Sequence, residues 1–166
     1  EEELLKSNLE PTNQWYAIAK ITGIKLCQAL KKQYNFNAIS LMPTNLYGPG
    51  DNFNGINSHV PAALLDRFHN AKILNSKEVK VWGSGNPLRE FMHVDDLAEG
   101  LIFLMENYSE YEHINIGTGK EISITEFAEI IKNISGWKGK IKFDYFIPFQ
   151  PSNILSMTGN ILEILS

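Results

Sequence analysis

The chain has 166 residues, 43% of them hydrophobic, which is enough for one domain with a buried core. Its formal net charge of −4, from 15 basic and 19 acidic residues, excludes the broad positive field that attracts nucleic acid or an anionic membrane. The single cysteine, Cys27, excludes an internal disulfide framework and a multi-cysteine metal site. With no long apolar run and no basic signal start, we expect a cytoplasmic protein.

The predicted elements begin with a long helix that no strand precedes. From residue 13 to about residue 34, apolar side chains recur at the spacing of one helix face. Residues 37–42 form a short apolar run typical of a strand buried on both faces, and Pro43 ends it. Residues 45–55 are dense in turn formers and too long for a hairpin, which predicts a functional loop.

The alternation of helices and strands continues through the second half. We expect a helix over residues 59–75 with Leu64, Leu65 and Phe68 facing inward. The later expected elements are a strand at 77–82, a glycine turn at 83–85, an extended segment at 89–93, a helix over 97–105, a strand at 113–116, and a helix from a Ser123–Glu126 capping box to about 134. This order predicts an α/β fold whose parallel sheet is covered on both faces.

Tyr16 and Lys20 lie four residues apart in the first predicted helix, so their side chains project from the same face. An ammonium near a phenol favours the phenolate, which makes Tyr16 a candidate proton donor or acceptor for a carbonyl and alcohol pair. The same spacing also arises by chance. It gains support from the strand that follows, because ligands of open α/β sheets bind beyond the carboxyl ends of strands.

Among the four histidines, His59 is the candidate for chemistry. It stands at the start of the second predicted helix, where an imidazole can exchange protons with a substrate near neutral pH. For an isolated histidine, capping or packing is the commoner role. His69, His93 and His113 do not stand at metal-ligand spacings, so we interpret them as structural and predict no metal site.

Arg67 and Arg89 are candidates for binding a diphosphate, because a guanidinium presents a fork of donors that matches phosphate oxygens. An ion pair with Glu90 or Asp95 is the alternative role for Arg89. Trp82 precedes a glycine and could stack on a base or sugar, whereas core packing is the commoner role of a tryptophan at a strand end.

Six motifs resemble the GDP-L-fucose synthase family, which belongs to the extended short-chain dehydrogenases/reductases and the NAD-dependent epimerases/dehydratases. Their order and spacing match over about residues 10–143. They are Asn13–Lys20 (NQWYAIAK), Met42–Pro49 (MPTNLYGP), Asn57–His59 (NSH), Val81–Gly85 (VWGSG), Arg89–Asp96 (REFMHVDD) and Asn115–Gly119 (NIGTG). The Tyr-x-x-x-Lys pair is shared with many relatives, whereas the NSH and VWGSG strings are more particular.

The resemblance implies a fold and a division of the chain. The fold would be the C-terminal part of a Rossmann-like doubly wound parallel sheet together with a small α/β substrate-binding domain. Residues 1–46 would complete the Rossmann-like domain. Residues 47–166 would mainly bind the sugar nucleotide, with segments that return to the Rossmann sheet.

The resemblance also implies an activity, namely NADP-dependent 3,5-epimerisation and 4-reduction of GDP-4-dehydro-6-deoxy-D-mannose to GDP-L-fucose. Tyr16 would give a proton to the sugar O4, Lys20 would hold the nicotinamide ribose, and His59 would be the acid in epimerisation and would contact the cofactor. The residues Pro43, Thr44, Asn45 and Leu46 would border the nicotinamide. The residues Arg67, Trp82 and Arg89 would face the GDP portion. Members of the family form homodimers.

The sequence departs from the family in two places. The family's glycine-rich loop, a catalytic serine and a catalytic cysteine belong to a front segment that the 166 residues do not contain. After Asp144, residues 147–156 also lack the basic residues that the family carries there. Two alternatives therefore stand beside the main interpretation. One is another nucleotide-sugar epimerase or dehydratase, and the other is a non-catalytic fragment that binds a sugar nucleotide or completes a partner chain.

Overall fold

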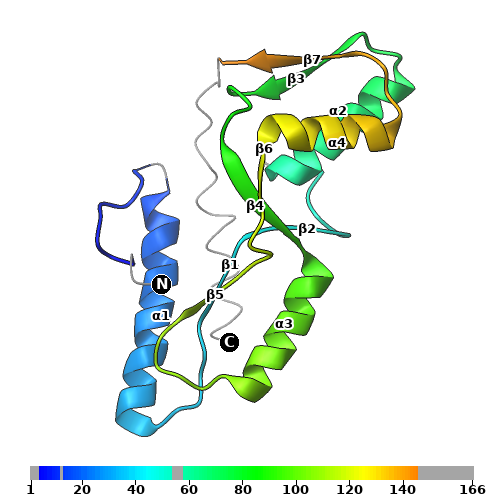
Figure 1. Ribbon diagram of the computed structural model, residues 1–166. Helices are drawn as coiled ribbons and strands as arrows, with labels where there is room; N and C mark the ends of the chain where they lie inside the picture. The colour runs from blue at the N-terminus through cyan, green and yellow to red at the C-terminus, as the bar shows by residue number, and fades with distance from the viewer. Residues whose placement is uncertain (1–3, 12, 54–57, 146–166) are drawn as a thin grey trace. The chain divides into compact units, whose positions relative to one another are not determined.

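A computed structural model describes residues 4–11, 13–53 and 58–145, and their contacts divide them into two compact units (Figure 1). The first unit contains the described residues up to 42 and residues 100–116. The second contains residues 43–99 and the described residues from 117 onward. The chain therefore passes from one unit to the other three times within these residues, once inside a helix.

Helix α1 (Gln14–Tyr34) is the largest element of the first unit, and the expectation of a long helix is confirmed. It ends at Asn35, whose left-handed backbone conformation (φ 52°) is one that asparagine tolerates. The buried residue of α1 is Gln28, whose side-chain amide donates to the Tyr111 carbonyl at 3.2 Å. Much of the apolar stripe on α1 is instead exposed, with Trp15 59% and Leu26 51% accessible.

The other elements of the first unit are short strands and the end of a helix. Strand β1 (Leu41–Pro43) pairs with β5 (Ile114–Ile116), and α3 (Val94–Asn107) ends in this unit. The expected strand over residues 37–42 was wrong in its start and its burial, because residues 37–40 form no strand and Met42 is exposed. Residues 113–116 agree better with expectation, and His113 before β5 is buried.

The second unit is built on two small sheets. One has the order β2-β4-β6, formed by β2 (Asn45–Tyr47), β4 (Leu88–His93) and β6 (Glu121–Ser123). Strands β2 and β4 are parallel, and β4 and β6 are antiparallel. The other sheet pairs β3 (Glu78–Trp82) with β7 (Lys140–Asp144) in parallel. In Figure 1, α2 (Val60–Ile73) and α4 (Ile124–Ser135) lie next to this pair.

The core of the second unit lies between β3–β7 and the two helices. Phe68 of α2 is fully buried, and its ring meets Trp137 edge-on with the centroids 5.4 Å apart. The indole N–H of Trp137 donates to the Ser76 carbonyl at 2.9 Å, so this buried polar group is satisfied. Val79 and Val81 alternate with exposed neighbours along β3, as a strand covered on one face requires.

Three expectations for the second unit need correction. Leu65 is 43% exposed, because the inward face of α2 is set by Leu64, Phe68 and Ala71. The loop expected at 45–55 begins with strand β2, which pairs with β4, a strand far along the chain. Residues 54–57 of this expected loop lie outside the described part. Strands β6 and β7 were not predicted, because pairing with distant strands holds them and their own sequences carry little signal.

The capping box was predicted correctly. Ser123 caps α4, accepting from the Glu126 backbone N–H while the Glu126 carboxylate accepts from Ser123. Across the described segments, no helix combines the length and the hydrophobicity needed to cross a membrane.

Candidate functional site

Tyr16 and Lys20 lie on one side of α1, about one helical turn apart. The Lys20 ammonium is 5.5 Å from the centroid of the Tyr16 ring, and both side chains are exposed. An ammonium over an aromatic ring is attracted by the ring's electron-rich face. The pair is therefore accessible to a ligand, and it presents a hydroxyl and a cation side by side.

The segment from Pro43 to Leu46 joins the end of β1 to β2, and its polar side chains are already bonded. The Thr44 hydroxyl donates to the Glu90 carbonyl at 2.8 Å, and the Asn45 amide donates to the same oxygen at 3.0 Å. Pro43 is exposed, whereas Leu46 is half-buried and lines a small pocket. These bonds hold the segment against β4.

His59 opens into that pocket, which has a volume of about 300 Å³. It occupies the N-cap position of α2 in an extended conformation, and its side chain is 80% exposed. Its Nδ1 lies 3.9 Å from Oδ1 of Asp51, a carboxylate that is only 19% exposed. An exposed imidazole beside a largely covered carboxylate is suited to carrying a proton to a substrate.

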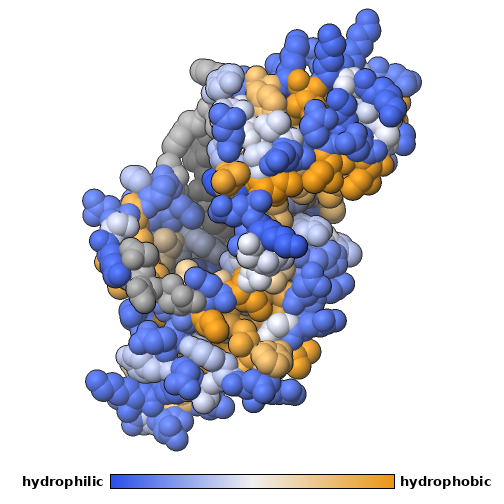
Figure 2. Space-filling model, in the orientation of Figure 1, coloured by the Kyte–Doolittle hydropathy of each residue, from blue (hydrophilic) through white to orange (hydrophobic). Residues whose placement is uncertain are grey.

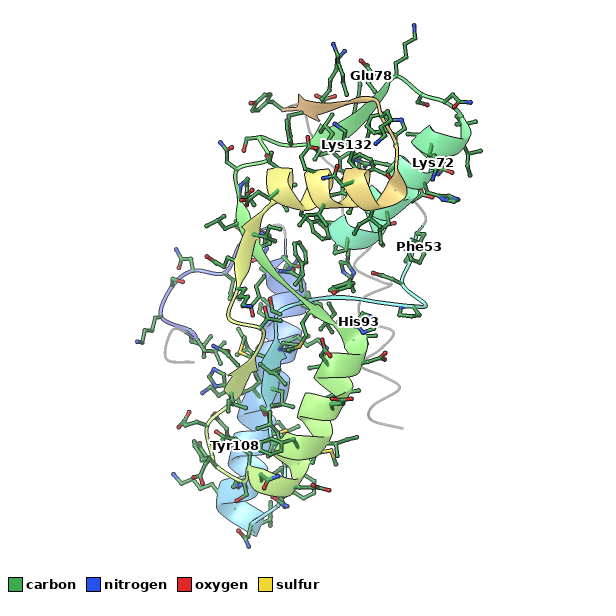
Figure 3. All side chains as sticks on the ribbon, turned by 45° about the vertical axis from the view of Figure 1, so that its right-hand side comes forward. Phe53, Lys72, Glu78, His93, Tyr108 and Lys132 are labelled. Carbon is green, nitrogen blue, oxygen red and sulfur yellow. The ribbon has the colours of Figure 1, made fainter. Side chains whose placement is uncertain are left out.

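Val94, where β4 passes into α3, also lines this pocket, and His93 directly precedes it (labelled in Figure 3). The His93 ring meets Tyr47 edge-on at a centroid distance of 5.3 Å, and its Nδ1 accepts from the Asp95 backbone N–H at 3.2 Å. His93 is thus engaged with its neighbours. This agrees with the structural role expected for it.

Arg67 and Trp82, which are far apart in sequence, come together in the second unit. The Arg67 guanidinium carbon lies 4.1 Å from the Trp82 ring centroid, and Nη1 donates to the Lys80 carbonyl at 3.1 Å. Partial burial lowers the pKa of Arg67, and the adjacent Asp66 carboxylate acts in the opposite direction. The guanidinium stays charged, because an arginine's ordinary pKa is far above neutrality.

This stacked pair lines a pocket of about 420 Å³ beside the exposed edge of β3. Because the ring and the Lys80 carbonyl fix the plane of the guanidinium, its remaining N–H groups are preorganised for an anion. Asp66, Asn70 and Ser76 add polar groups to the wall. The pocket therefore offers an aromatic face and a cation, which together suit a nucleotide.

Arg89 does not join them. Its Nη1 donates to the Leu88 carbonyl at 2.7 Å, its side chain is exposed, and it is absent from the lining of both pockets. The alternative role, an ion pair with Glu90 or Asp95, is not formed in the described residues: Asp95 lies near His93, and the Glu90 carboxylate accepts from Gly119. Arg89 keeps the freedom to reach a ligand from β4.

A third hollow, of about 1060 Å³, is mainly apolar and lies within the second unit. It explains the exposure of Leu65, which lines it together with Phe127, Ile130 and Ile134. Figure 2 shows hydrophobic side chains gathered along one side of this unit. No sequence pattern had indicated this surface.

The candidate residues are thus distributed over both units. Tyr16 and Lys20 belong to the first, whereas His59, Arg67, Trp82 and Arg89 belong to the second. Sequence reasoning missed Asp51 and Glu90, which contact candidate residues. The proximity of Asp51 to His59 in sequence was an available signal, but the bonds of Glu90 join distant segments and gave none. No group of three or more His, Cys, Asp or Glu side chains within the described residues could hold a metal.

Residues 1–117 match the NAD dependent epimerase/dehydratase family. Since this match covers more than half of the 166 residues, the chain belongs to that family.

Within this family the chain is a homologue of GDP-L-fucose synthases, as the motifs predicted. It is 60% identical over 164 residues to the probable GDP-L-fucose synthase 1 of Oryza sativa subsp. japonica, a match covering 99% of this chain and 50% of the relative. The GDP-L-fucose synthase of Escherichia coli strain K12 is 50% identical over 168 residues, covering 95% of this chain and 52% of its own. The chain therefore spans about half the length of the curated relatives it matches.

A solved structure supports the fold. A GDP-L-fucose synthetase from Naegleria fowleri bound to NADP superposes with a TM-score of 0.77 at 29% identity, covering 96% of this chain and 51% of that one. The predicted α/β class is confirmed, with parallel pairs β2–β4 and β3–β7. The described strands form three small sheets, one of them partly antiparallel, instead of the single parallel sheet that was expected. NADP is bound by that relative.

Proposed function

We propose that this chain is the portion of a GDP-L-fucose synthase that carries the Tyr16–Lys20 pair and the GDP-sugar subsite. The whole enzyme would convert GDP-4-dehydro-6-deoxy-D-mannose to GDP-L-fucose by epimerising two carbons beside the ketone and reducing the ketone. The single observation that carries the proposal is the 60% identity to the rice relative across 99% of this chain. The exposed Tyr16–Lys20 pair and the Arg67–Trp82 pocket provide the matching chemistry.

In this proposal Tyr16 acts on the ketone oxygen and Lys20 holds the cofactor. The Tyr16 hydroxyl donates a hydrogen bond to that oxygen, which stabilises the enolate formed when a proton leaves the neighbouring carbon. During reduction Tyr16 gives its proton to O4. The accessible Lys20 ammonium fits a cofactor ribose, because its N–H groups can donate to ribose hydroxyls while it stays beside the Tyr16 ring. NADPH supplies the hydride when bound.

His59 is proposed as the acid that returns a proton to carbon during epimerisation. Its exposed imidazole can reach a ligand in the pocket next to β2, and the Asp51 carboxylate lies 3.9 Å from its Nδ1. Pro43 to Leu46, together with His59, would border the nicotinamide. This assignment is supported by the position of the segment directly after β1, at a strand end where α/β proteins bind ligands.

Arg67, Trp82 and Arg89 are proposed to bind GDP. Arg67 would meet the diphosphate with N–H groups left over from its bond to Lys80, and Trp82 would give the base or ribose an apolar surface. Arg89 would turn from the Leu88 carbonyl toward the phosphates. In domain terms, residues 1–46 complete the cofactor-binding domain and residues 47–166 mainly bind the sugar nucleotide. A cytoplasmic location is part of the proposal.

Calorimetric titration of the 166-residue chain with GDP tests the subsite. We expect GDP to bind, and Trp82→Ala and Arg67→Ala each to weaken it about tenfold, the loss of one charge-assisted or stacking contact. Arg67→Lys should restore little, because an ammonium lacks the planar fork that stacks and binds two oxygens. His69→Ala, an exposed change on the same helix, serves as the control.

The preference of the subsite for the guanine base, and the assignment of His59 to a different site, are tested by the same titration. UDP and dTDP should bind less tightly than GDP, and a preference for either would favour another nucleotide-sugar epimerase or dehydratase. His59→Ala should leave GDP affinity unchanged. If GDP does not bind although the chain is folded by circular dichroism, the proposed subsite is wrong.

We also propose a homodimer that involves α1. Three large apolar side chains on this helix, Trp15, Ile18 and Leu26, are between 45% and 59% exposed in the isolated chain. Burial of such a surface favours association. Sedimentation velocity should show a dimer, and Leu26→Arg should shift the population to monomer, whereas Lys32→Ala on the same helix should not. A monomer at all concentrations contradicts this part of the proposal.

A further inference from the structure

Glu90 lies between Arg89 and Phe91 on β4 and binds two neighbouring segments with different parts of the residue. Its backbone carbonyl accepts two side-chain hydrogen bonds, at 2.8 Å from the Thr44 hydroxyl and at 3.0 Å from the Asn45 amide. These two donors belong to the segment that follows β1. The main chain at Glu90 therefore fixes where that segment runs.

The Glu90 side chain reaches the turn between β5 and β6. Its Oε1 accepts from the Gly119 backbone N–H at 2.6 Å and from the Thr118 hydroxyl at 3.1 Å. The carboxylate also packs against Gly117 so closely that a Cβ at this position would overlap Oε1. Bonds to a charged acceptor are shorter and stronger than neutral ones, as the Gly119 distance indicates.

One residue thus ties together three segments that are distant in sequence: residues 44–45, strand β4, and residues 117–119. The first and last of these directly follow strands β1 and β5. Residues after strand ends are where α/β proteins bind ligands. Arg89, adjacent on β4, takes its position from the same strand.

We propose that Glu90 is a positioning residue: its carbonyl holds Thr44 and Asn45, and its carboxylate holds the Gly117–Gly119 turn beside the strand that carries Arg89. Only the link to the turn depends on the carboxylate, because the Thr118 and Gly119 donors converge on Oε1 whereas Thr44 and Asn45 bond to the backbone carbonyl, which every side chain keeps. The inference rests on the proposed function where it concerns ligands. The geometry of the Gly117–Gly119 turn can be tested without any ligand.

The test compares Glu90→Ala and Glu90→Gln in the 166-residue chain. Glu90→Ala should speed amide exchange at Gly119 about tenfold or more, measured by NMR, because the hydrogen bond to a charged acceptor is lost. It should also weaken GDP binding by about tenfold, because the turn that loses its anchor lies beside the strand that carries Arg89. Glu90→Gln keeps an acceptor oxygen and should recover most of both effects. Rescue by the amide separates positioning from a change in overall charge.

Glu121 provides a matched control, since it is the partner of Glu90 in the β4–β6 register and is exposed. Glu121→Ala should change neither Gly119 exchange nor GDP affinity. If Glu90→Ala does not fold, Thr118→Val replaces it, because it removes one of the two donors at nearly constant volume and should speed Gly119 exchange to a lesser degree.

The inference is overturned if Gly119 exchange is unchanged in Glu90→Ala, or if GDP affinity is unchanged while exchange rises. It is also overturned if Glu121→Ala has the same effects as Glu90→Ala. Failure of the unmodified chain to bind GDP would count against the proposed function, and Glu90 would then be judged by Gly119 exchange alone.

Discussion

Adjacent residues on α2 serve opposite purposes. Phe68 is fully buried against Trp137, whereas Arg67 lies one position earlier and stacks on the exposed Trp82. A rotation of 100° per residue along the helix separates the two directions. The same helix thereby anchors the core of the second unit and presents a cation to a pocket. Substitutions at the two positions should therefore be separable into effects on stability and effects on binding.

Phe68→Ala should destabilise the second unit by about 3–5 kcal/mol, the range for removing a fully buried aromatic side chain and leaving a cavity. Leu65→Ala, on the same helix but exposed, should cost clearly less. Urea denaturation followed by tryptophan fluorescence measures the difference, since Trp137 contacts Phe68. Similar losses for the two variants would contradict the position of the core described above.

At the scale of elements, local signals and distant contacts decide different features. The N-terminus of α4 is determined locally, because Ser123 and Glu126 bond to each other within one helical turn. The turn between β3 and β4 depends on distant residues instead, because Gly85 faces Thr125 and Phe143. The two cases lead to different predictions.

Glu126 should make the stability of the chain depend on pH. Hydrogen bonds from the Ser123 hydroxyl and then from its backbone N–H lower the pKa of Glu126 below its ordinary value. A carboxyl whose folded pKa is lowered stabilises the protein above its unfolded pKa, roughly 4.3, and the stabilisation is lost as pH falls through the lowered value. The advantage over Glu126→Gln should therefore exist at neutral pH and vanish in acid.

Thermal melts of both proteins between neutral and acidic pH measure this advantage. Glu129→Gln removes a carboxylate from the same helix outside the capping box and controls for general charge effects. A difference between the proteins that stays constant down to the lowest pH would refute the prediction.

Gly85→Ala should be far more harmful than Gly83→Ala. Both glycines have positive φ, 76° and 83°, so each alanine carries a backbone cost of about 1–2 kcal/mol. At Gly83 a Cβ meets nothing within 4 Å, whereas at Gly85 it would overlap Thr125 and Phe143. Overpacking should add about 1–3 kcal/mol at Gly85. Urea midpoints of the two variants decide the matter, and equal midpoints would show that the turn can move aside.

At the scale of the whole molecule, the candidate residues fall into two compact units. The first unit carries Tyr16 and Lys20, and the second carries the Arg67–Trp82 pocket. Each unit should therefore respond to its own ligand. In the proposed function, which rests on the homology to GDP-L-fucose synthases, both ligands take part in the same reaction.

Hydrogen–deuterium exchange with GDP present should show protection in β3 and the second half of α2, and no protection in α1. The reason is that GDP would contact Arg67 and Trp82, whose backbone belongs to these elements. Trp82→Ala should remove the protection, and His69→Ala should preserve it. Protection confined to α1 would place GDP in the first unit and would contradict the proposal.

How much the sequence predicted depended on how local each feature is. Helices α1, α2, α3 and α4 were expected near their observed positions, because periodicity, Asp95–Asp96 and the Ser123–Glu126 box are readable over one or two turns. Strands β2, β6 and β7 were not expected, because strands of three to five residues are defined by partners elsewhere in the chain. The inward direction of Leu65 failed for a related reason, since the neighbouring α4 decides which side of α2 is covered.

The sequence by itself determined the family, the α/β class and the candidate residues. The reason is that motifs such as Asn13–Lys20 and Arg89–Asp96 are defined by residue types and spacing, which can be read without knowing the fold. Only the tertiary structure decided which of these residues meet: Arg67 with Trp82, Asp51 with His59, and Glu90 with both residues 44–45 and the Gly117–Gly119 turn. The physical reason is range. Spacing along a helix or strand is encoded in a few neighbouring residues, whereas contacts between distant segments result from the packing of the whole unit.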